Sequence, residues 1–321
     1  MFTFTSISYN HSDYIIQHLE SIKFQIESYG AGMKFDYVLC DDNSKDDTVE
    51  LANRWLSNNQ GLFRKVTVVK NNKNEGTVRN YLKAISLLET SEGKILASDD
   101  LYGTRNIFDV YRSDKIVLNF SYPFFLDDKE VKTFSVNSKY FDKAKLFMLI
   151  NNSYFLKLFI SNNGSLSGPA TYYPTVYLQD EGLPKSMSKY KLVEDRPLWK
   201  HLFVKRKLAG QVVYNYNPLI YYRTSVGVTS SESPVHDLFK RDCDLLAKES
   251  GLIGKLPKLI NPFNYVIKAL IFYSKILSVT QEKLHVGRYY SLSRTIESER
   301  SIAIKHIEML NSKALFFKCQ K

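Results

Sequence analysis

The chain has 321 residues, of which 44% are hydrophobic and 14% aromatic, and its formal net charge is +11. This apolar content is enough for a sizeable core and excludes a disordered or low-complexity protein, while the length favours one large domain with an appendage, or two domains. The three cysteines, Cys40, Cys243 and Cys319, are far apart and have neither metal-binding nor redox spacing. We therefore expect a reducing compartment.

The first residues, MFTFTSISYN, lead directly into an alternating strand without a basic leader, so we expect no signal peptide. The sequence also contains no uninterrupted apolar run of about 18 residues, as a membrane-spanning helix would need. Both observations predict a cytoplasmic protein.

Strands and amphipathic helices alternate over the first hundred residues. The pattern predicts strands at 2–8, 35–40, 65–70 and 94–98, and helices at 12–29, 46–59 and 77–90. This alternation is typical of an α/β fold with a mostly parallel sheet flanked by helices. In such sheets the ligand lies at the carboxyl ends of the strands.

The second half of the chain is less regular. It predicts strands within 114–135, a helix near 141–160, a small-residue loop at 161–171, a helix beginning near Glu194, and two short strands within 211–223. From about residue 235 onward the pattern is mostly helical. We expect a catalytic domain at 1–234, divided into halves at 1–113 and 114–234, and a basic helical C-terminal extension at 235–321.

A polar cluster follows each of the four predicted strands. These clusters are SYN (8–10), DDNS (41–44), NNKNEG (71–76) with Arg79 just beyond it, and the pair Asp99–Asp100. Because the carboxyl ends of parallel strands meet at one edge, we expect the clusters to line one crevice. The glycine patterns of dinucleotide-binding and P-loop proteins are absent, as is zinc-site spacing.

Five motifs in order resemble the inverting glycosyltransferases of family 2, which have the GT-A fold. They are TSISYN, CDDNSKDDT, NEGTVRN, ASDD and the later VEDRPLW, and SGPATYYP resembles an acceptor-side loop of bacterial surface-polysaccharide enzymes. The resemblance covers about residues 2–225. It implies transfer of a sugar from a nucleotide-diphosphate sugar, with UDP as the expected carrier, to a glycan or a polyprenyl-diphosphate-linked acceptor in capsule or O-antigen biosynthesis.

On the nucleotide side, the resemblance implies that Asp42 binds the base or ribose, with Asp41 beside it and Tyr9 lining the base pocket. Arg79 would approach the base or the diphosphate, and Asp99 the ribose or the sugar. The alternatives are structural: Asp41 and Asp42 as a strand-end turn, and Asp99 as a helix cap.

On the reaction side, the resemblance implies that Asp100 binds Mg²⁺ or Mn²⁺ and that Asp195 is the general base, with Glu194 as its helper. One base on the acceptor side is enough for a single in-line displacement, and the metal stabilises the departing diphosphate. The alternative for Glu194 and Asp195 is a helix cap before Pro197.

The sequence departs from the family pattern at two points. Its acid motif reads Ser98-Asp99-Asp100 instead of D-x-D, and the histidine that many relatives carry after the Tyr-Arg pair is missing. The next histidine is His236, which we do not expect to complete the metal site.

The tail is strongly basic, with 12 Lys and Arg against four Asp and Glu from Lys255 to Lys321. Residues 261–279 have the layout of an interfacial helix on anionic lipid, and a helix packed on the catalytic domain is the equal alternative. No nucleic-acid-reading motif accompanies the charge, so nucleic acid is not expected as a partner. The expected partners are a nucleotide sugar, a glycan or lipid-linked acceptor, and the inner face of the cytoplasmic membrane.

Two other functions compete with the sugar transferase. A nucleotidyltransferase uses a similar sheet and carboxylate-bound metal, but would normally carry a glycine-rich basic loop after the first strand, where this chain has SYNHSDY. A catalytically inactive membrane-surface scaffold of the same fold is the other, and the intact set of Asp99, Asp100 and Asp195 argues against it.

Overall fold

The computed structural model describes residues 1–111, 115–119, 125–127, 130–132, 153–162, 168–215, 217–223, 235–250 and 286–320. Its centre is a parallel sheet with the strand order β3-β2-β1-β4. The strands are β1 (Phe2–Ser8), β2 (Phe35–Asp41), β3 (Lys65–Lys70) and β4 (Glu92–Ala97). All seven residues of β1 and of β2 are buried, as expected of central strands covered on both faces.

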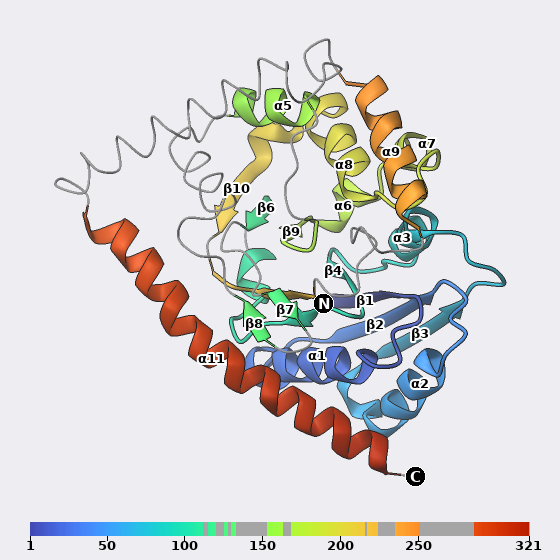
Figure 1. The fold of residues 1–321 in the computed structure, drawn as a ribbon, viewed down its shortest axis with the longest axis vertical. Coiled ribbons are helices and arrows are strands. Elements are labelled where there is room, and N and C mark those ends of the chain that lie inside the picture. Colours follow the sequence, from blue (N-terminus) through green and yellow to red (C-terminus); the bar gives the residue numbers. More distant parts are fainter. Residues whose placement is uncertain are drawn as a thin grey trace.

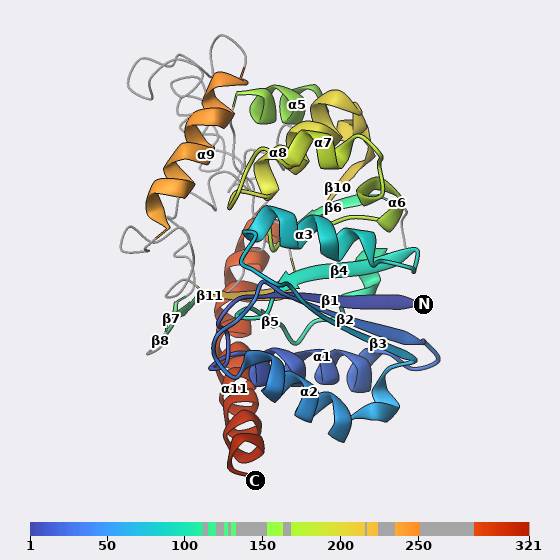
Figure 2. The same cartoon turned by 90° about the vertical axis from the view of Figure 1, so that its right-hand side faces the viewer.

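Helices cover both faces of this sheet. The helices α1 (Ile15–Tyr29) and α2 (Thr48–Asn58) lie on one face, and α3 (Thr77–Ser86) lies on the other (Figure 2). Alternate side chains of β2 enter two separate hydrophobic cores: Leu39 packs on the α1 side, and Val38 and Cys40 pack on the α3 side. The predicted βαβ order is thus confirmed, with strand ends within two residues of the prediction.

A second layer of elements follows the sheet on the α3 side (Figure 1). This layer contains a small sheet with the order β10-β6-β9. A further small sheet has the order β5-β11-β7-β8, and its strand β5 packs against α1 on the opposite side of the central sheet (Figure 2). Their strands are β5 (Leu101–Tyr102), β6 (Ile116–Asn119), β7 (Phe125–Asp127), β8 (Glu130–Lys132), β9 (Thr171–Tyr172), β10 (Val212–Asn215) and β11 (Ile220–Arg223). The helices are α5 (Ser153–Ser161), α6 (Thr175–Leu178), α7 (Leu183–Met187) and α8 (Asp195–Trp199), which continues as a π-helical turn at Lys200–Lys205. Single 3₁₀ turns lie at Gln60–Leu62, Phe108–Tyr111 and Leu208–Gln211.

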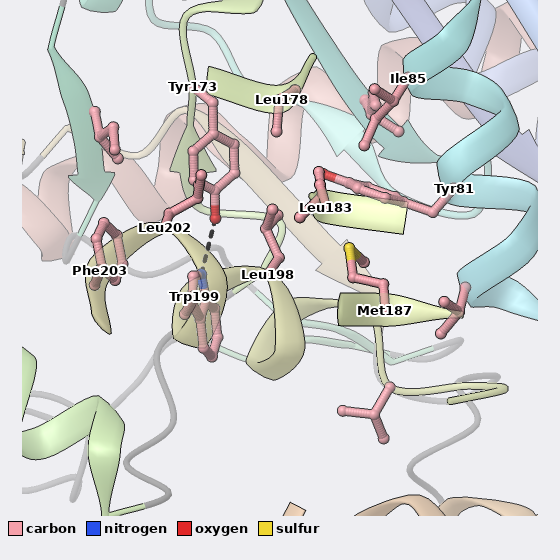
Figure 3. Close-up of a cluster of buried hydrophobic side chains, with 14 of the residues drawn as sticks. Tyr81, Ile85, Tyr173, Leu178, Leu183, Met187, Leu198, Trp199, Leu202 and Phe203 are labelled. Atoms are coloured by element: carbon pink, nitrogen blue, oxygen red, sulfur yellow. Dashed lines mark hydrogen bonds between the residues drawn. The ribbon is translucent and has the colours of Figure 1, made fainter. Parts of the chain in front are cut away.

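The core between α3 and the second layer combines aromatic and aliphatic side chains (Figure 3). Tyr81 of α3 and Tyr173 contribute to it, and the hydroxyl of Tyr173 accepts a hydrogen bond of 2.8 Å from the indole nitrogen of Trp199. Because Trp199 lies in α8, this core fixes the short helix that begins at Asp195.

Two helices of the C-terminal extension pack on the rest of the chain. Leu246 of α9 (His236–Lys248) belongs to the core on the α3 side. The long helix α11 (Val286–Cys319) runs along α1 (Figure 1), where Lys313 pairs with Glu20 at 3.6 Å and Phe317 lies under the guanidinium of Arg54. The boundary predicted between 234 and 235 stays a prediction, with these contacts running across it.

Part of the prediction falls outside the described residues. This applies to the predicted interfacial helix at 261–279 and to most of the helix predicted at 141–160, of which α5 represents the end. None of the helices in the described ranges has the length and apolar character needed to span a bilayer.

Candidate functional site

The strand ends of the central sheet bring the predicted polar clusters to one edge. In the strand register Ser8 lies opposite Asp41, and Asp41 lies opposite Lys70. Tyr9, directly after β1, is 42% exposed at this edge. The clusters after β1, β2 and β3 are therefore neighbours in space, as the sequence predicted.

Asp41 and Asp42 have different surroundings. Both carboxylate oxygens of Asp41 accept hydrogen bonds from Ser44, and the turn that they close places Asn43 in the left-handed region at φ 67°. The Asp41 side chain is fully buried, so its hydrogen bonds match the strand-end turn that was the structural alternative. The contact with a ligand predicted for Asp41 stays a prediction.

Asp42 organises the loop after β3. Its Oδ1 accepts hydrogen bonds from the Asn71 amide at 2.9 Å and from the Glu75 backbone at 2.8 Å, and its Oδ2 accepts one from Gly76 at 2.8 Å. A carboxylate has about four acceptor sites, so Oδ2 retains capacity for one further donor, such as a base N–H or a ribose hydroxyl. Arg79, in the first turn of α3, is exposed.

The acid pair after β4 is not a helix cap. The chain continues from Asp100 into the short strand β5, which rules out the alternative of a cap followed by a first-turn acid. Ser98 is fully buried, and its hydroxyl is hydrogen-bonded to Ser8 at 2.7 Å and to His11 Nδ1 at 2.8 Å. The Ser98 hydroxyl thus helps to hold the His11 ring in place, and His11 Nδ1 lies 3.9 Å from the Asp99 carboxylate.

Asp100 points into the protein and is only 1% exposed. Its Oδ1 accepts a hydrogen bond of 2.9 Å from the backbone of Arg223, whereas its Oδ2 has no hydrogen-bond partner among the described residues. Burial raises the pKa of this carboxyl well above its usual range, and the neighbouring charge of Asp99 raises the pKa further.

The fit of a divalent cation to this pair follows from these contacts. Within the described ranges, no group of three or more His, Cys, Asp and Glu side chains is arranged to hold a metal by itself. Mg²⁺ commonly binds through one or two carboxylates and takes its other ligands from substrate phosphates and water. The unpartnered Oδ2 of Asp100, with Asp99 beside it, fits that kind of site, although the role of Asp100 stays a prediction.

Arg223 is a residue that the sequence reasoning left without a role. Its backbone binds Asp100, its Nε donates to the carbonyl oxygen of Asp99 at 3.0 Å, and its guanidinium lies 4.2 Å from the ring centroid of Tyr14. The sequence signal was the Tyr-Arg pair at the end of a predicted strand. Only the antiparallel pairing of β11 with β5 places that strand beside the acid pair.

Glu194 and Asp195 form the second acidic pair. Neither caps a helix in the usual way, because α8 begins at Asp195 and Glu194 makes no side-chain capping bond. Burial raises the pKa of Glu194 to about 8, with a further contribution from Asp195, and burial also raises the pKa of Asp195. A carboxylate with a raised pKa is a better general base near neutral pH.

Gly168 borders Asp195 from the loop before β9. A methyl group at Gly168 would lie 3.2 Å from the Asp195 Cβ and 3.5 Å from its Oδ2. Buried Lys94 of β4 holds the same loop by donating to the carbonyl oxygens of Pro169 at 2.7 Å and Thr171 at 2.8 Å. Neither Gly168 nor Lys94 was singled out by residue number from the sequence.

The segment before the Glu194–Asp195 pair is in direct contact with the loop that Asp42 organises. The Val78 backbone N–H, in the first turn of α3, donates to the carbonyl oxygen of Lys191 at 3.0 Å. Gly76 lies against the same carbonyl group, because a Cβ there would come within 2.7 Å of its oxygen. The two acidic sites are therefore linked through a short stretch of backbone.

Comparisons with known proteins agree with this architecture. Residues 5–97 match the model of glycosyl transferase family 2. No curated protein sequence is significantly similar to the chain.

Two solved structures of TarS from S. aureus, both of residues 1–349, are similar to the whole chain. For the complex with UDP-GlcNAc the TM-score is 0.51, and for TarS alone it is 0.52; in both cases the identity is 16%, with 98% of this chain and 88% of the TarS chain covered. At this identity the likeness establishes the fold.

Proposed function

We propose that the chain is an inverting, metal-dependent glycosyltransferase, because residues 5–97 match the model of glycosyl transferase family 2 and the fold is similar to that of TarS. It moves a sugar from a nucleotide-diphosphate sugar to a hydroxyl group of a glycan or polyprenyl-diphosphate-linked acceptor. The observation that carries the proposal is the junction of two acidic sites: the strand-end carboxylates on one side, and the half-buried pair Glu194–Asp195, which follows a segment held against the same loop, on the other.

The donor nucleotide binds at the strand ends in this proposal. Tyr9 covers the base, Asp42 uses its remaining acceptor site on the base or ribose, and Arg79 is free to turn toward the phosphates from the first turn of α3. Asp99 contacts the ribose or the sugar. UDP is the first carrier to test, since the similar TarS structure was obtained with UDP-GlcNAc.

The transfer is a single displacement. Asp195, with Glu194 beside it, takes the proton from the acceptor hydroxyl; the acceptor oxygen then bonds to the anomeric carbon as the bond from that carbon to the phosphate oxygen breaks, and the nucleoside diphosphate leaves. Asp100, with Asp99, would hold the Mg²⁺ or Mn²⁺ that neutralises charge on the leaving diphosphate. The raised pKa values of the acidic pair support the base assignment.

The proposed biological setting is the synthesis of a surface polysaccharide such as capsule or O-antigen, in the cytoplasm or on the inner face of the membrane. The basic C-terminal extension supports an anionic partner, either membrane lipid or an acceptor diphosphate. In the described part of α11, Leu315 and Phe316 are 66% and 69% exposed, near the half-buried Lys313 and Lys318.

The experiment is a panel of nucleotide sugars, including UDP-GlcNAc, incubated with the protein in the presence of Mn²⁺ or EDTA. Binding and the slow release of nucleoside diphosphate are measured. We expect one nucleotide sugar to bind and turn over, with EDTA removing turnover. Failure of every nucleotide sugar to bind would overturn the proposal.

Two variants separate the roles. Asp195→Asn should abolish turnover and leave donor binding intact, because it removes the base and keeps the volume of the side chain. Asp100→Asn should weaken metal-dependent donor binding as well as turnover. Loss of donor binding in Asp195→Asn would contradict the base assignment, and unchanged behaviour of Asp100→Asn would contradict the metal assignment.

The nucleotidyltransferase alternative is distinguished by its products, because it joins a sugar phosphate to a nucleotide and releases pyrophosphate. Pyrophosphate formation from a nucleoside triphosphate and a sugar phosphate would favour it. Binding of nucleotide sugar without any turnover would instead favour the inactive scaffold.

A further inference from the structure

Asp242 of α9 is a fully buried carboxylate that grips one short stretch of backbone. Its Oδ2 accepts hydrogen bonds from three successive N–H groups, those of Lys191 at 2.8 Å, Leu192 at 2.7 Å and Val193 at 3.2 Å. Successive N–H groups that converge on one oxygen form an anion-binding concavity, which favours a full negative charge over a neutral acceptor.

The backbone segment that Asp242 binds, residues 191–193, lies directly before the proposed base. Val193 is followed directly by Glu194 and Asp195. On its other side the same stretch is held by α3, through the hydrogen bond from Val78 to the carbonyl oxygen of Lys191. The backbone before the acidic pair is thus clamped between α3, which begins at the nucleotide side, and α9.

The helix α9 is itself firmly attached next to the clamp. Lys200 donates to the carbonyl oxygen of Leu246 at 3.0 Å and to the hydroxyl of Ser250 at 3.0 Å. At the end of the helix, Glu249 accepts a hydrogen bond of 2.7 Å from the Tyr190 hydroxyl. Because α9 is held in place by these contacts, the hydrogen bonds of Asp242 fix the position of residues 191–193 relative to the helix.

A buried carboxylate destabilises a protein core more than an apolar side chain of similar size would. The other oxygen of Asp242, Oδ1, is buried and has no hydrogen-bond partner among the described residues. Burying a charged group costs free energy unless its hydrogen bonds compensate, and among the described residues the side-chain hydrogen bonds of Asp242 go to one backbone segment. Fixing that segment is the evident use of the group.

We propose that Asp242 is a positioning residue for the transfer reaction: it fixes residues 191–193, and through them the placement of Glu194 and Asp195. The inference rests on the proposed function. It assigns a role in the reaction to the C-terminal extension, which lies well beyond the segment that matches the family model.

The test compares Asp242→Ala, Asp242→Asn and Asp244→Asn in the full chain. Asp244 lies on the same helix and is exposed, so its variant makes the same change of charge without touching the loop. The measurements are kcat for the nucleotide sugar that the wild type turns over, and Kd for UDP or GDP, whichever the wild type binds, with Mn²⁺.

A misplacement of the base by about 1 Å can cost about 100-fold in rate. We expect Asp242→Ala to lower kcat about 100-fold and Asp242→Asn about 10-fold, since asparagine keeps one oxygen acceptor without the charge. The Kd of the nucleotide should stay within about twofold in both variants, because its proposed site lies at the strand ends. Asp244→Asn should behave as wild type.

Two results overturn the inference: a kcat within about threefold of wild type in Asp242→Asn and Asp242→Ala, or a loss of nucleotide affinity that parallels the loss of kcat. The second result would mean that Asp242 only supports the fold. If Asp242→Ala does not fold, the milder Asp242→Asn decides, checked by its thermal unfolding. A wild-type protein that turns over no nucleotide sugar would instead refute the proposed function itself.

Discussion

Replacement of Gly76 by alanine should damage the junction between the two acidic sites. Gly76 has φ 92° and ψ 158°, a region that is essentially open to glycine alone and costs other residues about 1–3 kcal/mol. The new Cβ would also lie 2.7 Å from the carbonyl oxygen of Lys191, where ordinary contact begins at 3.4 Å. That oxygen is a backbone atom and is bound to Val78, so it cannot move without breaking a hydrogen bond.

The matched control is Gly32→Ala. Gly32 has a positive φ of 78°, but none of the described residues has an atom within 4 Å of a Cβ built there, so this variant carries the strain without the clash. We expect Gly32→Ala to lose about 1 kcal/mol of unfolding free energy and Gly76→Ala about 3 kcal/mol or more. At about 2–4 °C per kcal/mol, Gly76→Ala should unfold about 6–12 °C below wild type.

The assay is urea and thermal unfolding of both variants, followed by nucleotide-sugar turnover at a temperature where both are folded. Gly76→Ala should also lose turnover, because the displaced carbonyl belongs to the segment that leads into the acidic pair. The reasoning would be refuted if Gly76→Ala were no less stable than Gly32→Ala.

Three further predictions concern the base and its surroundings. The acid limb of kcat/KM should lie near neutral pH, because burial raises the pKa values of the Glu194–Asp195 pair and activity is lost as pH falls and the base is protonated; a limb near pH 4 in a pH–rate profile would contradict this. Gly168→Ala should lower kcat several-fold, because its Cβ would lie 3.2 Å from the Cβ of Asp195. The control Gly61→Ala, whose Cβ would have no atom of the described part of the chain within 4 Å, should leave kcat unchanged. Burial lowers the pKa of Lys94 to about 7. Between pH 7 and the higher pKa of a lysine in the unfolded chain, the unfolded state therefore binds more protons at this residue than the folded state does. The contribution of Lys94 to the unfolding free energy consequently rises with pH over this range. The unfolding free energy of wild type relative to Lys94→Met should therefore rise by up to about 1.4 kcal/mol per pH unit from pH 7 to 9, and denaturant titrations that give a constant difference would disprove it.

The place of the polar clusters at one edge of the sheet was predictable, because it depends on where the strands end. Tyr9, Asp42 and Asp99 follow strands of one parallel sheet, and the period of the sequence determines where those strands stop. The distinction between neighbours was not predictable. Asp41 and Asp42 are identical side chains one position apart. Only the turn geometry shows that the Asp41 carboxylate is hydrogen-bonded to Ser44, whereas the Asp42 carboxylate is hydrogen-bonded to the loop at 71–76.

The residues that the sequence reasoning missed all act across long distances in the chain. Arg223 meets the acid pair through the pairing of β11 with β5, and Asp242 reaches residues 191–193 from a helix about fifty positions later. Their local signals do not distinguish them, because an arginine at a strand end and an aspartate on an amphipathic helix are usually exposed to solvent. Burial in the folded chain is what makes them specific.

The sequence by itself determined the order of the βαβ units and the edge at which the polar clusters gather, since local periodicity decides both. The tertiary structure alone decided which acid turns inward, as Asp100 does, and which elements hold the proposed base in place. Those choices depend on contacts between segments far apart in the chain, whose free energy exists only after the cores on both faces of the sheet have formed.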